Sequence, residues 1–352
     1  MSLLNIGCQR MTYRVELAYS PLFEAALGIA AATYDQIHPT LEHPPSYWKQ
    51  LQSELPLEVE KELMYAKQHN TWKTLLHLLH QRSFPDLESF LSYLKKLSPF
   101  DLRYYSLPYL GEECQDARRQ AAEGSEEAMI QLQTSCRDHL FFPAYIAHIY
   151  TTEPDDLRRH LLCLMEGWFL THIKPHEETI VRTLERDCSQ KQVMQTKLSA
   201  EALVEWATNG SYPPEPTVTR VLLIPHAIYR PWTIQADAEG TKIFYYPVDD
   251  EHLHRDADPY RPPLPLVQAL KALGDEQRLR LVKMLSEQDL SLQEMTETLG
   301  GAKSTVHHHL SMLRSAHLVE TVNGKYRLKR TVLDKLPLHW EQFLGGSLDA
   351  RH

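Results

Sequence analysis

The sequence predicts a mainly α-helical protein that also contains a small β-sheet and ends in a compact domain of short helices and a hairpin. Three observations predict this class. At 352 residues the chain is longer than one hydrophobic core usually serves. Apolar residues recur at helical spacing through residues 46–208, and a proline-rich stretch at 212–216 then introduces short β-like runs. We therefore expect a helical domain at 1–211, a sheet segment and linker at 212–263, and a second domain at 264–352.

The first element is a strand that leads into a buried helix. Apolar and polar residues alternate from Tyr13 to Tyr19, the pattern of a β-strand. Ser20 and Pro21 then supply an N-cap and a first-turn proline for a helix that extends to about Tyr34. Because the surface of this helix is apolar on almost every side between Leu22 and Ala32, we expect it to be buried.

Helices follow one another through the next region, and strands replace them afterwards. The stretch from Asp155 to Asn209 has helical spacing with an expected break at Pro175. Three β-like runs come after it, at Val218–Ile224, Tyr229–Gln235 and Lys242–Val248. With the strand near Tyr13 they can close one small sheet. The charged, proline-containing residues 249–265 have the character of a linker.

Residues after the linker form a series of short helices with clear ends. Gly274 is expected to end one helix in the left-handed conformation, and Asp275 to cap the next, whose buried face is expected to hold Leu279, Val282 and Leu285. A capping box, Ser291 to Glu294, opens a further helix that closes at Gly300 and Gly301. The chain then turns into a helix over 304–316. This is a helix-turn-helix pattern.

The second helix of this motif separates its apolar and polar residues. Val306, His309, Leu310 and Leu313 share one face, with His309 half-buried, and Ser304, His307, His308 and Ser311 lie on the opposite face. Short polar and cationic side chains suit phosphates and base edges, and a helix N-terminus favours phosphate. The polar face is therefore expected to enter the major groove of DNA.

A β-hairpin with basic residues is expected to follow this helix. Asn323-Gly324 is a strong signal for a two-residue turn. The hairpin and its end carry four cations, Lys325, Arg327, Lys329 and Arg330. We expect them to contact the DNA backbone as a wing.

The charge distribution supports an anionic partner for this part of the chain. The whole chain has a formal charge of −9, which argues against nucleic acid. Residues 303–330, however, hold six Lys and Arg against one acid, Glu320. The local charge of +5 favours DNA contact by this segment, including Arg314.

These residues resemble the ArsR/SmtB class of bacterial winged-helix transcription regulators. The resemblance covers about 80 residues and rests on three stretches, Ala269–Asp275 with Arg278–Arg280, Ser304–Leu310 with Leu313-Arg314 and Leu318-Val319, and the wing hairpin. It implies a C-terminal winged helix-turn-helix, a homodimer, and an imperfectly palindromic double-stranded operator. It also implies DNA-reading roles for Lys303, Ser304, Thr305, His307 and His308. Ala302 departs from the serine often found at the cap of this helix.

Metal sensing is not expected. The family's metal sensors carry a Cys-x-Cys before the turn or Asp, His and Glu ligands in the last helix, whereas this chain has no thiol at 291–297 and only Asp334, His339 and Glu341 near Pro337. The pairs His77 with His80 and His172 with His176 have near-helical ligand spacing, but chance explains them in a chain of 19 histidines. No metal and no cofactor is predicted. Five scattered cysteines without a CxxC pair indicate reduced thiols.

The N-terminal region resembles, less closely, a domain that precedes the winged helix in some of these regulators, where a strand is followed by Ser-Pro-Leu-aromatic-Glu, as in Ser20–Glu24 here. The resemblance supplies no ligand, so the effector stays unknown. Aromatic residues of this region favour core packing, although they would also suit a pocket for a small-molecule effector. They are Tyr104, Tyr105, Tyr109, Phe141, Phe142, Tyr145, Trp168, Phe169 and Trp206.

The sequence therefore predicts a cytoplasmic, sequence-specific DNA-binding transcription regulator, a repressor controlled by an unidentified signal at the N-terminal domain. The longest apolar run, Ala25–Thr33, is too short to span a membrane, and the N-terminus lacks a secretion signal. Common catalytic motifs are missing, so we expect no enzyme. Two alternatives stay open: a winged helix that binds another protein, and a helical-domain enzyme with a winged helix as its output.

Overall fold

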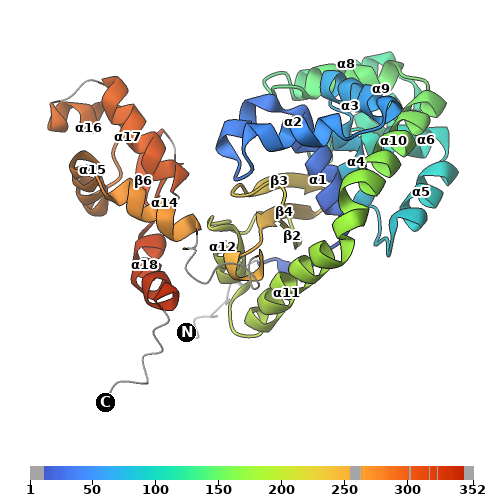
Figure 1. Cartoon of the computed structure of the whole chain (residues 1–352). Helices are drawn as coiled ribbons and strands as arrows, with labels where there is room; N and C mark the ends of the chain where they lie inside the picture. Colours follow the sequence, from blue (N-terminus) through green and yellow to red (C-terminus); the bar gives the residue numbers. More distant parts are fainter. Residues whose placement is uncertain are drawn as a thin grey trace, which may run out of the picture. The chain divides into compact units, whose positions relative to one another are not determined.

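The computed structural model describes residues 12–253, 262, 264–300, 303–316, 318–322 and 324–344. Over these residues the chain is mainly helical with two small sheets, so the predicted fold class is confirmed. The chain divides into two compact units, Met1–Leu253 and His254–His352 (Figure 1). We call them the N-terminal unit and the C-terminal unit, and each is described by itself.

A four-stranded sheet joins the two ends of the N-terminal unit. Its strands are β1 Arg14–Leu17, β2 Arg220–His226, β3 Ile234–Ala238 and β4 Thr241–Pro247, in the order β1-β2-β4-β3. β2 is parallel to both β1 and β4, whereas β3 is antiparallel to β4. Arg14 lies opposite Arg220 in this register. The predicted sheet of four strands is confirmed. The strands of the 212–263 segment belong to the N-terminal unit because β2 pairs with β1, and β4 and β3 continue the same sheet.

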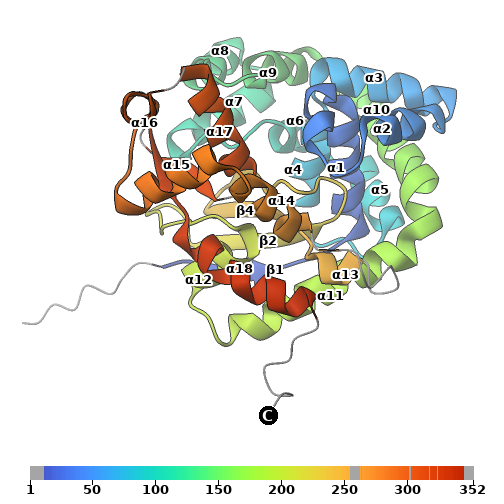
Figure 2. The same ribbon diagram turned by 60° about the vertical axis from the view of Figure 1, so that its left-hand side comes forward.

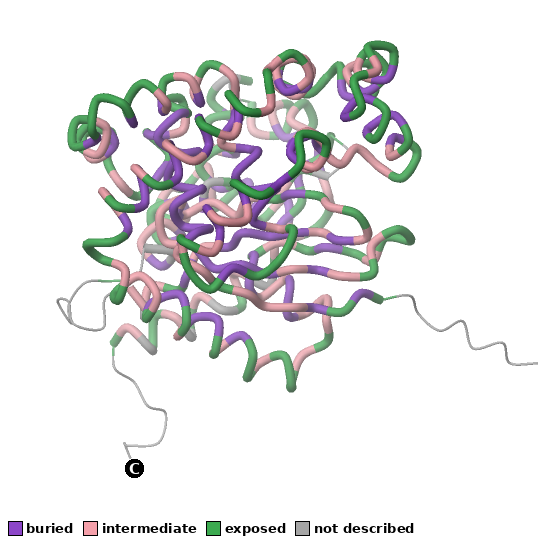
Figure 3. The backbone as a smooth tube through the Cα atoms, turned by 90° about the vertical axis from the view of Figure 1, so that its right-hand side faces the viewer, coloured by how far each residue is buried: buried purple, intermediate pink, exposed green. Residues whose placement is uncertain are grey.

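The sheet is covered on both faces because its strands alternate apolar residues between two cores. On β4, Ile243 and Tyr245 belong to the large core, which also contains the helix α1, Pro21–Thr33, and side chains of several later helices. Phe244 and Tyr246 belong to a smaller core that contains Leu203 of α12, Ala200–Thr208. Figure 3 shows the buried strands running through the middle of the N-terminal unit.

The N-terminal unit is otherwise built from helices. Ser20 caps α1 by accepting a hydrogen bond from the backbone N–H of Leu22 at 3.2 Å, and residues 22–33 of α1 are all buried. The predicted cap and the buried helix are therefore confirmed. The α-helices are α1 Pro21–Thr33, α2 Pro45–Ser53, α3 Leu57–His69, α4 Trp72–Leu79, α5 Leu87–Lys96, α6 Pro99–Ser106, α7 Gln115–Glu123, α8 Glu126–Ser135, α9 Phe142–Thr151, α10 Pro154–Trp168, α11 Glu177–Gln195, α12 Ala200–Thr208 and α13 Asp250–Leu253. Short 3₁₀ turns occupy Asp35–Thr40 and Glu112–Cys114.

The expected break at Pro175 is confirmed. α10 ends at Trp168, a π turn follows over Phe169–Ile173, and a 3₁₀ turn over Lys174–His176 contains the proline. α11 then starts at Glu177. Proline has no N–H for a helical hydrogen bond, which explains why one continuous helix does not form here.

The strand expected at Tyr229–Gln235 is wrong in position, since β3 begins only at Ile234. The backbone from Ala227 to Trp232 forms turns instead, and the N–H groups of Ala227 and Ile228 donate to the buried carboxylate of Glu24. Pro231 also lacks the N–H that a strand ladder would use. Glu24 of the Ser-Pro-Leu-Phe-Glu stretch thus fixes this turn. Burial raises the pKa of Glu24 to about 7.

The C-terminal unit combines short helices with a two-stranded sheet (Figure 2). Its elements are α14 Leu264–Leu273, α15 Glu276–Glu287, α16 Leu292–Leu299, α17 Lys303–Ser315, β5 Val319–Val322, β6 Lys325–Leu328 and α18 Arg330–Phe343. A separate core holds this unit together, with Leu281, Met295, Leu310 and Leu318 among its fully buried side chains. A helix-turn-helix followed by a hairpin is therefore what the residues form.

Two details expected for this unit are wrong. Leu279 is 50% exposed, and Leu281 and Leu285 form the buried face of α15. The spacing of leucines in α15 is compatible with a buried face that contains either Leu279 or Leu281. Packing against α17 and β6 selects the face with Leu281. Gly274 does not take the left-handed conformation. Its N–H donates to the Leu270 carbonyl at 2.9 Å, and an added Cβ would lie 3.1 Å from that oxygen, so close approach explains the glycine.

Among the described residues, no helix is long and apolar enough to cross a lipid bilayer. The four cysteines that fall within the described ranges, Cys114, Cys136, Cys163 and Cys188, are free thiols.

Candidate nucleic-acid interface

The turn between α16 and α17 is fixed by caps on one side and by apolar packing on the other. Ser291 and Glu294 form the predicted capping box at the start of α16. Gly300 ends α16 in the left-handed conformation, with φ of 69°, which glycine adopts without steric cost. Met295 of α16 and Val306 of α17 are buried in the same core. These contacts hold α17 against α16, and they leave the other face of α17 outside the core.

The outer face of α17 is polar and exposed. Lys303, Thr305, His307 and His308 are exposed, and so are Ser311 and Arg314 further along the helix. Ser304 lies in α17, but its side chain falls outside the described residues, as does Ala302. The predicted apolar stripe of Val306, Leu310 and Leu313 is buried and is therefore confirmed. This face carries hydroxyl, imidazole and cationic groups that can donate to phosphates and base edges.

His309 is half-buried, as expected. Its side chain is 15% exposed, and its Nδ1 atom lies 3.8 Å from an Asp275 carboxylate oxygen. Asp275 also caps α15 by accepting from the Arg278 N–H at 3.0 Å, and this hydrogen bond lowers the pKa of Asp275. His309 therefore belongs to the inner side of α17 and not to the exposed face.

The hairpin places its basic side chains on one face. Val322 pairs with Lys325 beside the turn, where Gly324 has φ of 76°; Asn323 lies outside the described residues. Lys325 and Arg327 are exposed, and the alternating Tyr326 and Leu328 are buried. Past the strand, Lys329 is half-buried and Arg330 is exposed. The strands alternate as the hairpin requires, so its cations face solvent together.

One wing arginine is already paired within the protein. The Arg327 guanidinium donates two hydrogen bonds to one carboxylate oxygen of Asp289, at 2.9 and 2.7 Å. The pairing lowers the pKa of Asp289 and raises the pKa of Arg327. Glu320 also lies opposite Arg327 on the hairpin. Arg330 donates to the backbone carbonyl of Ser286. Arg327 therefore starts from a partly neutralised state when DNA approaches.

Sequence reasoning missed Asp289, because this residue lies between two helices and before the helix-turn-helix. Leu290, its neighbour, exchanges backbone hydrogen bonds with Tyr326 at 3.1 and 2.7 Å and so forms an isolated antiparallel bridge to the hairpin. That pairing brings Asp289 next to Arg327. The available signal was Asp289 followed by Leu290, in a segment between two helices that is too short to form a helix itself.

The pairs His77 with His80 and His172 with His176 do not form metal-ligand clusters in the described part of the chain. There, three potential ligands come together at one place, where Asp187, Asp249 and His252 converge. The Lys191 ammonium lies between the two aspartates, at 3.0 Å from Asp187 and in contact with Asp249. A side-chain cation thus already fills this cluster.

Comparison with known proteins agrees with the geometry of the C-terminal unit. Residues 275–321 match the family model described as bacterial regulatory protein, arsR family. No curated protein and no solved structure matches the chain. The matched residues span α15, α16, α17 and most of β5, the elements that present the exposed polar face. The C-terminal unit therefore carries the DNA-binding helix-turn-helix of the ArsR family of transcription regulators.

Proposed function

We propose that the protein is a homodimeric, sequence-specific transcription repressor whose N-terminal unit receives the signal that releases DNA. One observation carries this proposal most strongly. Within the segment that matches the regulator family, α17 presents hydroxyl, imidazole and cationic side chains to solvent, while its apolar side chains are buried. This arrangement suits a helix that enters the major groove.

Different residues take different parts in DNA binding. His307, His308 and Thr305 lie on the face that would meet base edges, and Lys303 lies at the helix N-terminus, where phosphate is favoured. Ser304 and Ser311 complete the polar face predicted from the sequence. Arg314 and the wing residues Lys325, Arg327, Lys329 and Arg330 would hold the phosphate backbone. Phosphate contacts set affinity and position, whereas base contacts set sequence preference.

A homodimer is supported by apolar side chains that the C-terminal unit leaves exposed. Leu270 of α14 is 41% exposed, and Trp340 and Leu344, in and just after α18, are 44% and 64% exposed. α14 and α18 contact each other, so these residues suit a shared surface for a second copy. Two recognition helices in a dimer would meet half-sites about one DNA turn apart, on an imperfect palindrome.

The N-terminal unit is proposed to bind a signal molecule and not to transform it, in a protein that works in the cytoplasm. A signal can release DNA only if it binds the DNA-free arrangement more tightly than the DNA-bound one. One observation favours an enzyme instead: Lys73 and His77, with lowered pKa values, border the same cavity. We prefer binding because Nδ1 of His77 donates to the Ser106 carbonyl and, among the described residues, no side chain hydrogen-bonds to the side chain of either member of this pair.

The test is a fluorescence-anisotropy titration of the full chain against duplex from its own promoter, over a series of salt concentrations. We expect affinity to fall steeply with salt, and Lys325→Ala to lower the log-log salt slope by about one unit. His308→Ala should instead change which sequences are preferred. Lys283→Ala is the matched control, because Lys283 is an exposed α15 lysine outside the predicted contacts. Salt-independent binding, or equal effects of both lysine variants, would contradict the proposal.

A further inference from the structure

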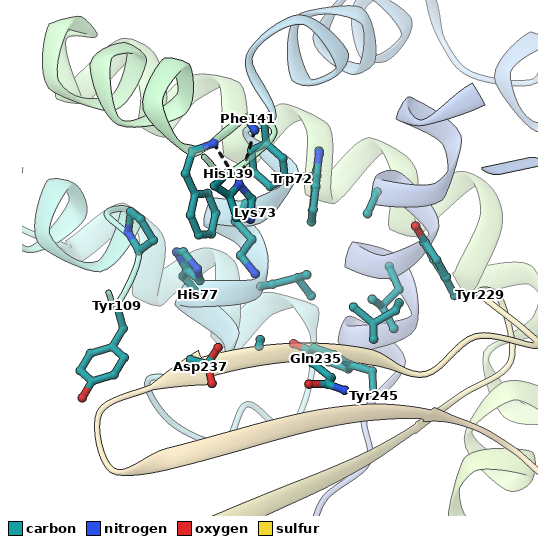
Figure 4. A pocket seen from close by; sticks show the side chains of 17 residues that line it. Trp72, Lys73, His77, Tyr109, His139, Phe141, Tyr229, Gln235, Asp237 and Tyr245 are labelled. Carbon is teal, nitrogen blue, oxygen red and sulfur yellow. Dashed lines mark hydrogen bonds between the residues drawn. The ribbon is translucent and has the colours of Figure 1, made fainter. Parts of the chain in front are cut away.

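A cavity lies inside the N-terminal unit, between helices α1 and α4 and the strand β3. Its volume is about 290 Å³, at the small end of the roughly 300–1,000 Å³ typical of ligand pockets. Six aromatic side chains line it, namely Trp72, Phe141, Phe142, Tyr109, Tyr229 and Tyr245. Leu27 and Ala30 of α1 add apolar surface, and the polar lining residues are Lys73, His77, His139, Gln235 and Asp237. Figure 4 shows these side chains surrounding an open space above β3.

Lys73 supplies a positive charge to this largely aromatic space. The residue is 9% exposed, and in Figure 4 its side chain extends from α4 with the ammonium directed into the cavity. Within the described residues, no carboxylate lies within 4.0 Å of Nζ and no hydrogen bond satisfies it. The Phe142 ring centroid, 5.9 Å away, is the aromatic face that Nζ approaches. With no hydrogen-bond acceptor from the described residues beside it, Nζ stays open to the cavity, where an anionic ligand can pair with it.

The neighbouring polar groups neutralise Lys73 only in part. His77 donates from Nδ1 to the Ser106 carbonyl, and burial together with Lys73 holds the pKa of His77 well below its usual range, so the ring is neutral. Asp237 faces the cavity mouth and its charge partly offsets the effect of burial on the pKa of Lys73, but its side chain is 55% exposed and pairs with Lys242 at 2.8 Å. Burial lowers the pKa of Lys73 to about 8. Lys73 is therefore still mostly charged at neutral pH.

We propose that this cavity binds a small aromatic carboxylate of one ring, with the carboxylate paired to the Lys73 ammonium and the ring held among Trp72, Phe141 and Phe142. The aromatic side chains already contact one another, with Trp72 and Phe141 centroids 5.6 Å apart and Phe141 and Phe142 centroids 5.0 Å apart. Such faces and edges stabilise a further ring by stacking or edge contacts.

The charge of the site selects a carboxylate over a phosphate. Lys73 offers one positive charge, which balances one negative charge. A phosphate dianion would leave a second charge uncompensated in a wall made mostly of carbon. The volume limits the size of the ligand, because a cavity of about 290 Å³ leaves little space beyond one ring and its acid group.

This inference rests on the proposed function only in treating the bound molecule as the signal. Binding itself needs no DNA, so it is measured on the full chain alone. A failure to bind carboxylates leaves the DNA experiment untouched, and a failure to bind DNA leaves the cavity experiment untouched.

The experiment is isothermal titration calorimetry with benzoate, phenylacetate and 3-phenylpropionate, beside benzamide and acetate. We expect at least one aromatic carboxylate to bind at least tenfold more tightly than benzamide, which has the ring without the charge, and acetate to show no binding. Lys73→Met should weaken the carboxylate by at least tenfold without weakening benzamide. Lys96→Met, at an exposed lysine of α5, should leave every affinity unchanged.

Thermal unfolding in parallel shows that Lys73→Met is folded, because it should melt no lower than the original protein. The proposal is overturned if none of the three aromatic carboxylates binds. It is equally overturned if benzamide binds as tightly as the carboxylate, or if Lys73→Met retains the original affinity for it. Mass spectrometry of the ligand after the titration separates binding from turnover, since a chemically changed ligand would favour the enzyme alternative.

Discussion

Two buried lysines of the N-terminal unit have opposite surroundings. Lys191 is 1% exposed, and its ammonium contacts the carboxylates of Asp187 and Asp249 and lies 4.7 Å from the Trp206 ring centroid. Lys73 is 9% exposed and faces a cavity with no carboxylate in ion-pairing reach in the part of the chain described. The same residue type is thus used once with two carboxylates in contact and once with none in contact among the described residues.

Lys191 and Lys73 show how a buried charge that stabilises the fold can be distinguished from a charge that is available to a ligand. Around Lys191, both aspartates and the aromatic ring are supplied by the fold, and Asp187 also accepts from the Asp249 N–H at 2.8 Å. This cluster fixes the chain just before α13, where the N-terminal unit ends. Around Lys73, the fold supplies the desolvation but only part of the counter-charge, from Asp237, which itself pairs with Lys242. The remaining compensation has to come from outside.

The largest effect is expected for Lys191→Met. Removing the ammonium leaves Asp187, which is fully buried, without its cation. Breaking a buried pair in this way costs about 3–5 kcal/mol, so the variant should unfold at much lower denaturant concentration. Chemical denaturation followed by circular dichroism measures this loss. A change below about 1 kcal/mol would contradict the structural role, which we place well above the usual effect of surface substitutions.

A smaller effect of opposite sign is expected for Lys73→Met. Methionine keeps the length and removes the uncompensated charge, so the ligand-free protein should gain about 1–3 kcal/mol of stability. The gain should depend on pH. The folded pKa is about 8, against an ordinary value of 10.5, so the original protein carries the full penalty below pH 8 and loses it as pH rises toward 10.5.

Denaturation of both proteins from pH 7 to pH 10 measures this dependence. The difference in unfolding free energy between Lys73→Met and the original protein should shrink across that range. A loss of stability at pH 7 would mean that Lys73 has a partner in the folded protein and that the comparison with Lys191 fails.

The C-terminal unit was more predictable than the N-terminal unit because its signals are local. Ser291 and Glu294 are three residues apart, and their capping box follows from that spacing alone. The hairpin follows from a two-residue turn. Leu279, one of the two details that were wrong, shows the limit: one helix offered two leucine stripes, and only contacts with α17 and β6 decide between them.

The cavity could not be predicted, because residues far apart in sequence create it. Lys73 comes from α4 and Asp237 from β3, and these elements meet only after the sheet has formed. The aromatic residues noted in the sequence divide between two roles that no spacing distinguishes. Tyr109, Phe141 and Phe142 line the cavity, whereas Tyr145 and Trp168 are buried in the core. A lysine inside the helical run Trp72–Leu79 was the one unusual residue, and in sequence it resembles an exposed position.

An exposed ion pair of the C-terminal unit contrasts with the two buried lysines, and its loss is expected to have the smallest effect on stability. Asp289 and Arg327 form an exposed pair, with side chains 36% and 49% exposed, and exposed pairs add little to stability. Asp289→Asn should therefore leave the melting temperature almost unchanged. It should instead strengthen DNA binding several-fold, because Arg327 loses a competing partner and the phosphates lose a nearby negative charge.

Anisotropy titrations of Asp289→Asn, Arg327→Ala and the double variant test whether the pair acts in DNA binding. Arg327→Ala should weaken binding and lower the salt slope by about one unit. The gain from Asp289→Asn should be smaller when Arg327 is already replaced, because part of it acts through that arginine. Equal gains in both backgrounds would show that Arg327 does not reach the DNA. The wing would then act through Lys325 and Arg330, and the charge of Asp289 would matter only through the general field of the unit.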